Sequence, residues 1–244
     1  NIPAFMENEL RKHLRNLLTE AATQRRSVWH KLGNILLEMA IIVFAVWFAV
    51  FMERNREHSA EQKEVKEFLL GLKTDLESDI VEMRGDTSGY GYSGQARALR
   101  YFARADSIQM DSLKRYYHVF QSETHLLINN GRFEGFKASG KLNTIANVEL
   151  RNSILDLYQE KLVALTNATS RHLVLKREML SLIRRNRVLM QQSGDNLVSV
   201  LGMPEVKNYC FQLSDVSYII ERYQEASLLS ARIIAMINET YRLN

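Results

Sequence analysis

An almost unbroken apolar run constrains what this chain can fold into more than any other feature. It begins at Leu32, ends at Met52 and reads LGNILLEMAIIVFAVWFAVFM, with only Asn34 and Glu38 as interruptions. A helix rises 1.5 Å per residue, so these 21 residues reach about 32 Å, close to the roughly 30 Å hydrocarbon core of a bilayer. Residues 32–52 are therefore predicted to form a transmembrane helix.

Two other interpretations of the run are a cleaved signal peptide and the core helix of a soluble protein. The apolar part of a signal peptide covers about 7–15 residues near the N-terminus and ends in small residues. Here 31 residues precede the run, and Glu53 and Arg54 follow it. Trp29 and Trp47 lie near its two ends, where interfacial tryptophans are common. We therefore favour a true membrane span.

The charges on the two sides of the run predict its orientation. Residues 1–31 contain six Lys or Arg and three Glu, a net charge of +3, whereas residues 53–84 contain six basic and nine acidic groups. Basic flanks of a span tend to stay in the cytoplasm. We therefore expect residues 1–31 to form a cytoplasmic segment and residues 53–244 an extracytoplasmic domain.

The net charge gives no reason to expect a nucleic-acid partner. The chain carries +4, and removing the +3 of residues 1–31 and the −1 of Glu38 leaves only +2 for residues 53–244. The pI near 9.1 is thus partly a property of the short tail. Cys210 is the only cysteine, so no intrachain disulfide can form and packing must hold the large domain together.

The N-terminal segment has a pattern of its own. Leu10, Leu14, Leu17 and Leu18 share one face of a helix, and basic residues occupy the other. Such a helix can lie on the inner membrane surface and bind anionic lipid. The alternative is that it packs against a partner or against its own neighbours, and we favour membrane lipid.

Helical periodicity dominates the remainder of the chain, and apolar/polar alternation is scarce. The spacing of apolar residues extends the span as one long helix to about Arg84. Further helices are expected over residues 95–120, 133–142 and 147–192, after Pro204, and from about residue 216 to Tyr241. The predicted fold class is all-α: a transmembrane helix that continues into an antiparallel bundle of four long helices.

Residues at the ends of these segments predict where the helices begin and stop. Asn147 is a predicted N-cap, and Ser214 or Asp215 the N-cap of the last helix. Gly140 suits a left-handed helix end. The segment GDTSGYGYSG, residues 85–94, holds four of the eleven glycines and is expected to be a loop rather than a phosphate-binding loop, since no Lys-Ser or Lys-Thr follows.

Three sequence features follow one another in a defined order. Glu38 opens the most apolar part of the span, LKTDLESDI occupies residues 72–80, and RFEGFKASGKLNTIANVELRNSILDLYQ occupies residues 132–159. This order resembles a family of single-pass bacterial inner-membrane proteins of unknown function, common in Bacteroidetes, with LKxDLxxD and FxxxKxSGxL…ELR…LY motifs. The matching positions are Glu38, Leu72, Asp75, Leu76, Asp79, Phe133, Ser139, Gly140, Leu142, Ile145, Leu150 and Tyr158.

The resemblance covers about residues 10–160 and implies an architecture and a location, with no activity. It implies a bacterial inner-membrane setting, in which the extracytoplasmic domain expected from the flanking charges would be periplasmic. The chain departs from the family pattern after the span, where Met52-Glu53-Arg54-Asn55 replaces Asn-Asn-Trp-Asn, and at Asn34, where the family has Glu.

Glu38 is the one acidic residue inside the predicted span. An intramembrane carboxylate is a candidate for proton or cation handling, or for a hydrogen bond between helices. Alternatively, it reaches the cytoplasmic interface, helped by Lys31 and by the positive end of the helix dipole. We favour the second interpretation.

Other polar groups give weaker signals. The six histidines lie in different segments without the spacing of a metal site, and Cys210 between Tyr209 and Phe211 suits apolar packing. Tyr90 and Tyr92 are candidate contacts for a partner. The basic residues of the long helix predict a solvated face more than a site for an acidic partner or lipid head groups; they are Arg171, Lys176, Arg177, Arg184, Arg185 and Arg187.

No arrangement of residues predicts catalysis, a cofactor or a metal ion. We expect a non-catalytic, membrane-anchored interaction protein that joins other protein subunits, with Arg184, Arg185 and Arg187 as possible contacts. Two alternatives stay open: a periplasmic bundle that senses a ligand and works through a partner, and a homo-oligomeric channel that uses Glu38.

Overall fold

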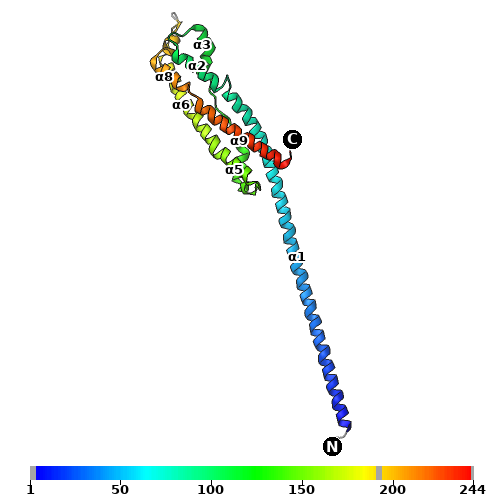
Figure 1. Ribbon diagram of the computed structural model, residues 1–244. Coiled ribbons are helices and arrows are strands. Elements are labelled where there is room, and N and C mark those ends of the chain that lie inside the picture. The colour runs from blue at the N-terminus through cyan, green and yellow to red at the C-terminus, as the bar shows by residue number, and fades with distance from the viewer. Residues whose placement is uncertain (1–3, 191–193, 243–244) are drawn as a thin grey trace. The chain divides into compact units, whose positions relative to one another are not determined.

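The computed structural model describes residues 4–190 and 194–242, and these residues are helical almost throughout (Figure 1). The predicted all-α class is confirmed. The chain divides into two compact units, residues 1–61 and 62–244. One long helix, α1 (Ala4–Thr87), contributes to both units. The apolar run and the helix after it are thus continuous, as predicted, although α1 ends at Thr87 rather than near Arg84.

In the first unit, the apolar part of α1 lies fully exposed. Every residue from Leu36 to Met52 is exposed, and a stretch beginning at Leu36 has a mean hydropathy of 2.2 with none of it buried. Among the described residues, this is the one helix long and apolar enough to cross a membrane. Rings contact one another along one face, with Trp47 and Phe51 at 5.6 Å between centroids.

Several predicted features of the first unit fall on side chains that the structure does not describe. These are the start of the span at Leu32, its neighbour Asn34, the interfacial Trp29 and the four leucines of the N-terminal segment. The later part of the predicted span, from Leu36, is described, and it includes Glu38, Trp47 and Met52, all exposed.

The second unit contains the remaining elements. The helices are α2 (Tyr92–Arg104), α3 (Met110–Tyr116), η1 (Tyr117–Phe120), α4 (Gly131–Ala138), η2 (Lys141–Thr144), α5 (Val148–Asp156), the π-helical turn η3 (Leu157–Lys161), α6 (Leu162–Asn186), α7 (Leu197–Leu201), α8 (Pro204–Leu213) and α9 (Ser217–Tyr241). Two short strands, β1 (Leu189–Met190) and β2 (Gly194–Asp195), pair antiparallel.

Two of the predicted long helices are interrupted. The predicted helix 95–120 is divided into α2, α3 and η1, because Ala105 takes an extended conformation (φ −66°, ψ 125°) and its carbonyl accepts a hydrogen bond from Lys207 at 2.6 Å. The predicted helix 147–192 consists of α5, η3 and α6, and it ends at Asn186. Strand β1 lies near the end of that range.

The glycine-rich turn between α1 and α2 is shorter than predicted, because α2 already begins at Tyr92. A Cβ atom at Gly91 would lie 1.9 Å from the carbonyl oxygen of Asp86, and one at Gly94 would lie 1.7 Å from that of Gly89. Only glycine fits these two positions, so the turn depends on them.

Three helix ends test the predicted caps. Asn147 caps α5, since its side chain accepts a hydrogen bond from the Leu150 amide at 3.0 Å, and Gly140 is left-handed with φ 74°; both predictions are confirmed. The N-cap position of α9 is Val216, so the prediction of Ser214 or Asp215 is wrong by position. The Asp215 carboxylate nevertheless accepts the Ser217 amide at 3.2 Å.

Two hydrophobic cores lie along the second unit. The first core joins α1, α4, α5, α6 and α9; its fully buried members include Leu72, Leu76, Leu150, Ile154, Leu157, Ile219, Ala226, Ile233 and Ile237. The second core joins α2, α3, α7, α8 and the end of α6; its fully buried members include Ala98, Leu99, Phe102, Val119, Met179, Leu201, Val206, Cys210 and Leu213. Figure 1 shows α6 and α9 side by side within this unit.

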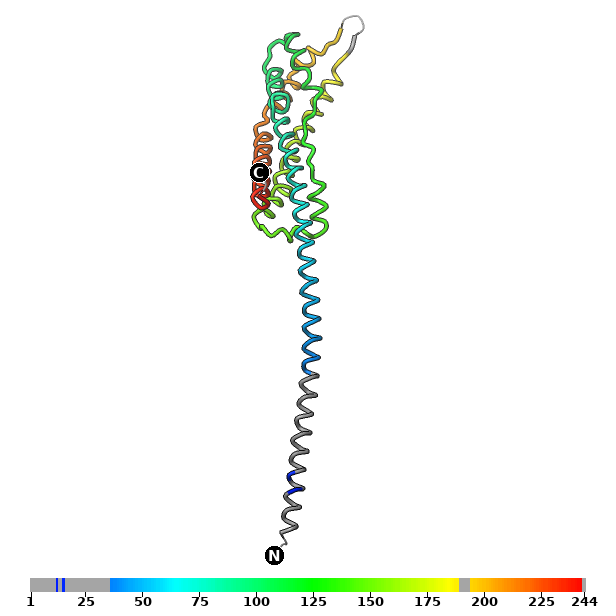
Figure 2. Tube along the Cα trace, turned by 90° about the vertical axis from the view of Figure 1, so that its right-hand side faces the viewer, coloured from blue at the N-terminus to red at the C-terminus, as the bar shows by residue number. Residues whose placement is uncertain are grey.

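A segment of ten residues without helix or strand runs between η1 and α4. We call residues 121–130 the strap. Its even-numbered residues from Ser122 to Ile128 are half-buried and its odd-numbered residues are exposed, which is the two-residue alternation of an extended chain. Figure 2 shows the strap, in green, beside the last part of α1.

The N-cap of α5 gives a direct test of this local structure. Replacing Asn147 with Ala removes the side-chain acceptor of the Leu150 amide, so we expect a loss of about 1 kcal/mol in the free energy of unfolding. Asn152→Ala, an exposed change inside the same helix, is the control and should leave stability unchanged or slightly raised. Denaturant unfolding followed by circular dichroism measures both. Equal effects of the two changes would contradict the cap.

Candidate functional site

The strap is held by side chains from the helices around it. Because the strap has no partner strand, its backbone groups need other hydrogen-bond partners wherever water is excluded. The Tyr92 hydroxyl donates to the Thr124 carbonyl at 2.6 Å, and Gln95 donates to the Thr124 hydroxyl at 2.6 Å. Lys176 donates to the Ser122 carbonyl. Helices α2 and α6 thus fix the first half of the strap.

Helix α1 fixes the second half with carboxylates. Glu82 accepts the Leu127 amide at 2.8 Å, and Asp79 accepts both the amide and the side chain of Asn129, at 3.3 and 2.6 Å. Asp79 and Glu82 are three residues apart, a spacing that places two side chains on the same face of a helix. Asp75 continues this face, where its carboxylate pairs with Arg132 at 2.9 Å.

Asp79 is the most constrained of these carboxylates. It is fully buried, and its second oxygen has no hydrogen-bond partner among the described residues. Burial raises the pKa of Asp79 above its ordinary value, and the hydrogen bonds from Asn129 oppose that rise. The LKTDLESDI segment therefore supplies a joint between α1 and the strap.

Two other residues that carried the family resemblance, Phe133 and Tyr158, lie beside the same joint. Phe133 stacks on Tyr158 with ring centroids 4.3 Å apart, and the Tyr158 hydroxyl donates to the Asn129 carbonyl at 3.4 Å. Tyr158 belongs to the π-helical turn η3, whose extra residue per turn separates α5 from α6. These positions act in packing and in holding the strap.

Lys176 occupies a different place from the one predicted. It is only 1% exposed, so its assignment to a solvated basic face is wrong. Its ammonium donates to Gln95 at 2.8 Å as well as to the Ser122 carbonyl. Burial lowers the pKa of Lys176 to about 8, because the charged form loses its hydration, and Glu123 opposes this shift only in part.

His172 lies one helical turn before Lys176 and is also buried. Its ring meets the edge of Tyr92 at 5.4 Å, and Nε2 has no hydrogen-bond partner among the described residues. Burial, and then the positive charge of Lys176, lower the pKa of His172 to about 4. We call Gln95, His172 and Lys176 the polar layer; on α6 it lies between Ala168 of the first core and Met179 of the second.

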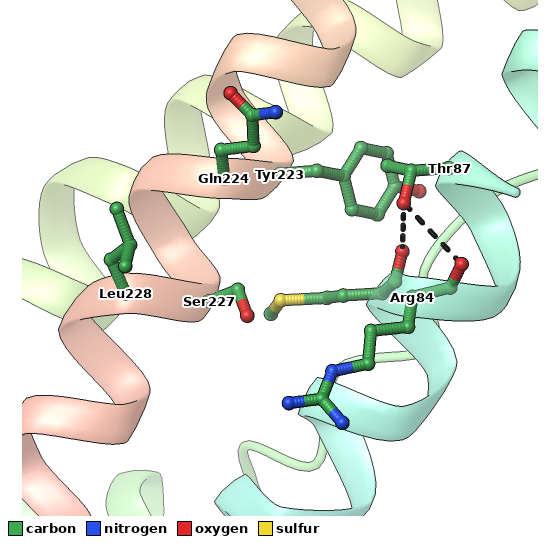
Figure 3. Close-up of a pocket in the computed structure, with 7 residues that line it drawn as sticks. Arg84, Thr87, Tyr223, Gln224, Ser227 and Leu228 are labelled. Carbon is green, nitrogen blue, oxygen red and sulfur yellow. Dashed lines mark hydrogen bonds between the residues drawn. The ribbon is translucent and has the colours of Figure 1, made fainter.

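A groove of about 380 Å³ lies between the end of α1 and α9 (Figure 3). Its lining consists of Met83, Arg84, Thr87, Tyr223, Gln224, Ser227 and Leu228. The Thr87 hydroxyl donates to the Met83 carbonyl at 3.0 Å and to the Arg84 carbonyl at 3.3 Å, so it is already occupied.

The groove combines an apolar floor with free polar groups at its rim. The Tyr223 hydroxyl donates to Asp86 at 2.7 Å, and burial together with this bond raises the pKa of Tyr223. Within the described part of the chain, neither Arg84 nor Ser227 has a side-chain partner. Such a groove can accept an apolar group of a ligand beside a cation.

The predicted partner contacts have different outcomes. Tyr90 is 93% exposed and free to contact a partner, whereas Tyr92 is buried and bonded to the strap, so its prediction as a partner contact is wrong. Arg184 and Arg185 are exposed. Arg187 is half-buried, with Nε 3.0 Å from both carboxylate oxygens of Asp195 and Nη1 donating to the Tyr117 hydroxyl at 3.1 Å.

Cys210 and Glu38 are the remaining groups singled out by the sequence. Cys210 is buried beside Met179, with the sulfurs 3.7 Å apart, and burial raises the pKa of its thiol to about 12; the predicted packing role is confirmed. Glu38 is exposed and has no hydrogen-bond partner within the described residues. Those residues also contain no group of three His, Cys, Asp or Glu placed to hold a metal ion.

The expected helices 95–120 and 133–142 leave residues 121–131 as a connection without a helix, and residues 121–130 are such a connection. Sequence reasoning missed the polar layer and the side chains that enclose the strap. The partners of Lys176 lie 81 and 54 positions away in the chain. Spacing along one helix cannot reveal them.

The buried lysine predicts a pH dependence of stability. Its folded pKa of about 8 lies below the ordinary 10.5, so the unfolded chain binds more protons between these values and stability rises with pH. Relative to Lys176→Met, the wild type should gain about 2 to 3 kcal/mol from pH 7.5 to pH 10. Denaturant unfolding in detergent measures this difference. Lys114→Met, an exposed control, should keep the wild-type profile, and parallel profiles for Lys176→Met would contradict a buried ammonium.

Comparisons of this chain with models of protein families, with curated proteins and with solved structures find no match. Its function is therefore argued from the geometry and the chemistry of its own residues.

Proposed function

We propose that this chain is a non-catalytic, single-pass membrane protein that acts as an accessory or scaffold subunit of a larger bacterial membrane complex. The observation that carries the proposal is the exposed apolar surface of α1. Its large apolar residues between Leu36 and Met52 are 47–67% exposed. Each such side chain gains about 1.5–3 kcal/mol when it leaves water, so a surface of this size requires lipid or protein around it.

Lipid is the better match for this surface. The apolar side chains surround the helix on all sides, whereas a protein partner would cover one stripe. A span also satisfies every backbone group within the helix itself. The basic residues before the run support a cytoplasmic N-terminus, and hence a periplasmic second unit at the inner membrane.

The second unit has the character of an interaction domain rather than an enzyme. We infer that it is an antiparallel helical bundle whose buried polar groups serve the strap. Its buried polar residues form hydrogen bonds with strap atoms, so a substrate has no access to them; they are Lys176, Asp79 and Tyr92. The exposed groups, such as Tyr90 and Arg184, suit contacts with other subunits.

A ligand-sensing bundle is the second candidate, and the α1–α9 groove favours it. Met83, Arg84 and Thr87 line the groove, and they belong to the same helix as the apolar segment. A ligand in the groove would therefore contact the proposed membrane helix directly. We propose that such a sensor works through a partner protein.

The membrane anchor predicts a simple fractionation result. The wild type should remain in the membrane pellet after carbonate extraction. A double change, Ile42→Arg with Ala45→Arg, places two charges at the middle of the span at a cost of about 2.5–3.5 kcal/mol each and should release the protein. The apolar control, Ile42→Leu with Ala45→Leu, should stay in the pellet. A wild-type chain found in the soluble fraction would refute the anchor.

Native purification followed by mass spectrometry separates the functional alternatives. Stable co-purifying subunits are expected for a scaffold. A lone chain with a bound metabolite that Ser227→Trp removes, and that Asn152→Trp keeps, would favour the sensor, because Ser227 lines the groove and Asn152 lies outside it. A homo-oligomer whose ion flux is lost in Glu38→Gln would favour the channel.

A further inference from the structure

Cations that have no acidic partner gather around the second core. In most of the second unit, Lys and Arg are paired with carboxylates; these pairs include Arg132–Asp75, Lys161–Glu225, Arg177–Glu123 and Arg232–Glu149. The helices around the second core differ. Their exposed cations without an ion pair among the described residues are Arg97, Arg100, Arg104, Lys114, Arg115, Arg184 and Arg185, of which Arg100 donates to the Ser214 carbonyl at 3.3 Å. We call this end of the unit the basic end.

A small pocket of about 220 Å³ opens at the basic end. Tyr117, Phe120, Leu180, Ile183, Arg184, Arg187 and Leu197 line it. Phe120, Ile183 and Leu197 are buried members of the second core, so the floor of the pocket is apolar. Arg184 and Arg187 provide its two guanidinium groups. The pocket therefore offers an apolar surface with positive charge beside it.

One of the two guanidinium groups is held in place and the other is free. Arg187 is fixed by Asp195 and by the Tyr117 hydroxyl, and Asp195 also accepts the Leu197 amide at 3.0 Å. Arg187 therefore already has an anionic partner, which keeps its charge largely satisfied. Arg184 has no such partner within the described residues, so it is the cation open to an incoming carboxylate.

A second set of hydrogen bonds holds the chain on both sides of Arg187. The Asn196 side chain accepts the Val188 amide at 2.7 Å and donates to the Asn186 carbonyl at 3.0 Å. These bonds tie the end of α6 to the start of α7. A pocket whose walls are already ordered loses little entropy on binding, which favours recognition of a definite shape.

We propose that the basic end is a docking site for a segment of a partner protein that carries one apolar side chain flanked by acidic residues. The inference rests on the proposed function as an interaction subunit and names its partner chemistry. The volume suits a single Leu or Phe side chain, and an acidic neighbour meets Arg184, the unpaired cation that lines the pocket. The exposed Arg185 follows it on α6 and adds to the positive charge. A membrane or a polyanion would use the charges but leave the apolar pocket without a role.

Defined peptides test the proposal on the full chain in detergent. The probe is a fluorescein-labelled peptide, Glu-Asp-Phe-Glu-Asp, blocked at its free end. A second peptide replaces its Phe with Ala, and a third replaces the four acids with Lys. We expect the first to bind and each change to weaken binding about tenfold or more, as measured by fluorescence anisotropy. Binding should also weaken as salt screens the charges.

Variants locate the site. Arg184→Gln together with Arg185→Gln should weaken the first peptide about tenfold. Arg171→Gln, an exposed arginine three to four turns earlier on α6 and outside the pocket, is the matched control and should have no effect. Circular dichroism confirms that all variants are folded.

Three outcomes would overturn the proposal. If the Phe-to-Ala change leaves the affinity of the peptide unchanged, and heparin or anionic vesicles bind equally well, the basic end is a site for polyanions or lipid. Equal losses in the Arg184/Arg185 and Arg171 variants would show a non-local charge effect. No binding of the first peptide would refute the docking site, while co-purification of subunits through another surface would leave the scaffold proposal intact.

Discussion

The second unit depends on the hydrogen bonds between helix side chains and the strap. An extended segment without a partner strand must still satisfy its buried backbone groups. Here the side chains of Tyr92 and Lys176 donate hydrogen bonds to its carbonyls. The carboxylates of Asp79 and Glu82 accept hydrogen bonds from its amides. The donors come from α2 and α6 and the acceptors from α1. The strap thereby connects three helices that periodicity alone would leave as independent amphipathic elements.

This arrangement explains why charged groups are buried at all. A buried ammonium or carboxylate is unfavourable unless it is well bonded, and an apolar replacement of the same volume is often no less stable. We infer that the polar layer serves specificity: His172 and Lys176 can lie only opposite Tyr92, Gln95 and the strap, which fixes how the second core is placed on the first.

Periodicity and capping chemistry allowed much of the fold to be predicted, because these signals are local. The continuous α1, the Asn147 cap, the left-handed Gly140 and the buried Cys210 all follow from short stretches of sequence. Tertiary placement could not be predicted in the same way. Lys176 and Tyr92 resemble surface residues in their own segments, and only distant strap atoms draw them inside. The pocket beside Arg184 combines η1, α6 and α7, so no single segment could indicate it.

The exposed part of α1 after the apolar run determines where the chain is most easily cut. Residues 53–61 are all exposed, so they are held mainly by helical hydrogen bonds and exposed pairs such as Glu53–Arg56. Short helical stretches without packing open readily. Arg54 and Arg56 place trypsin-type cleavage sites within this stretch, so limited digestion should release the C-terminal portion as a compact fragment.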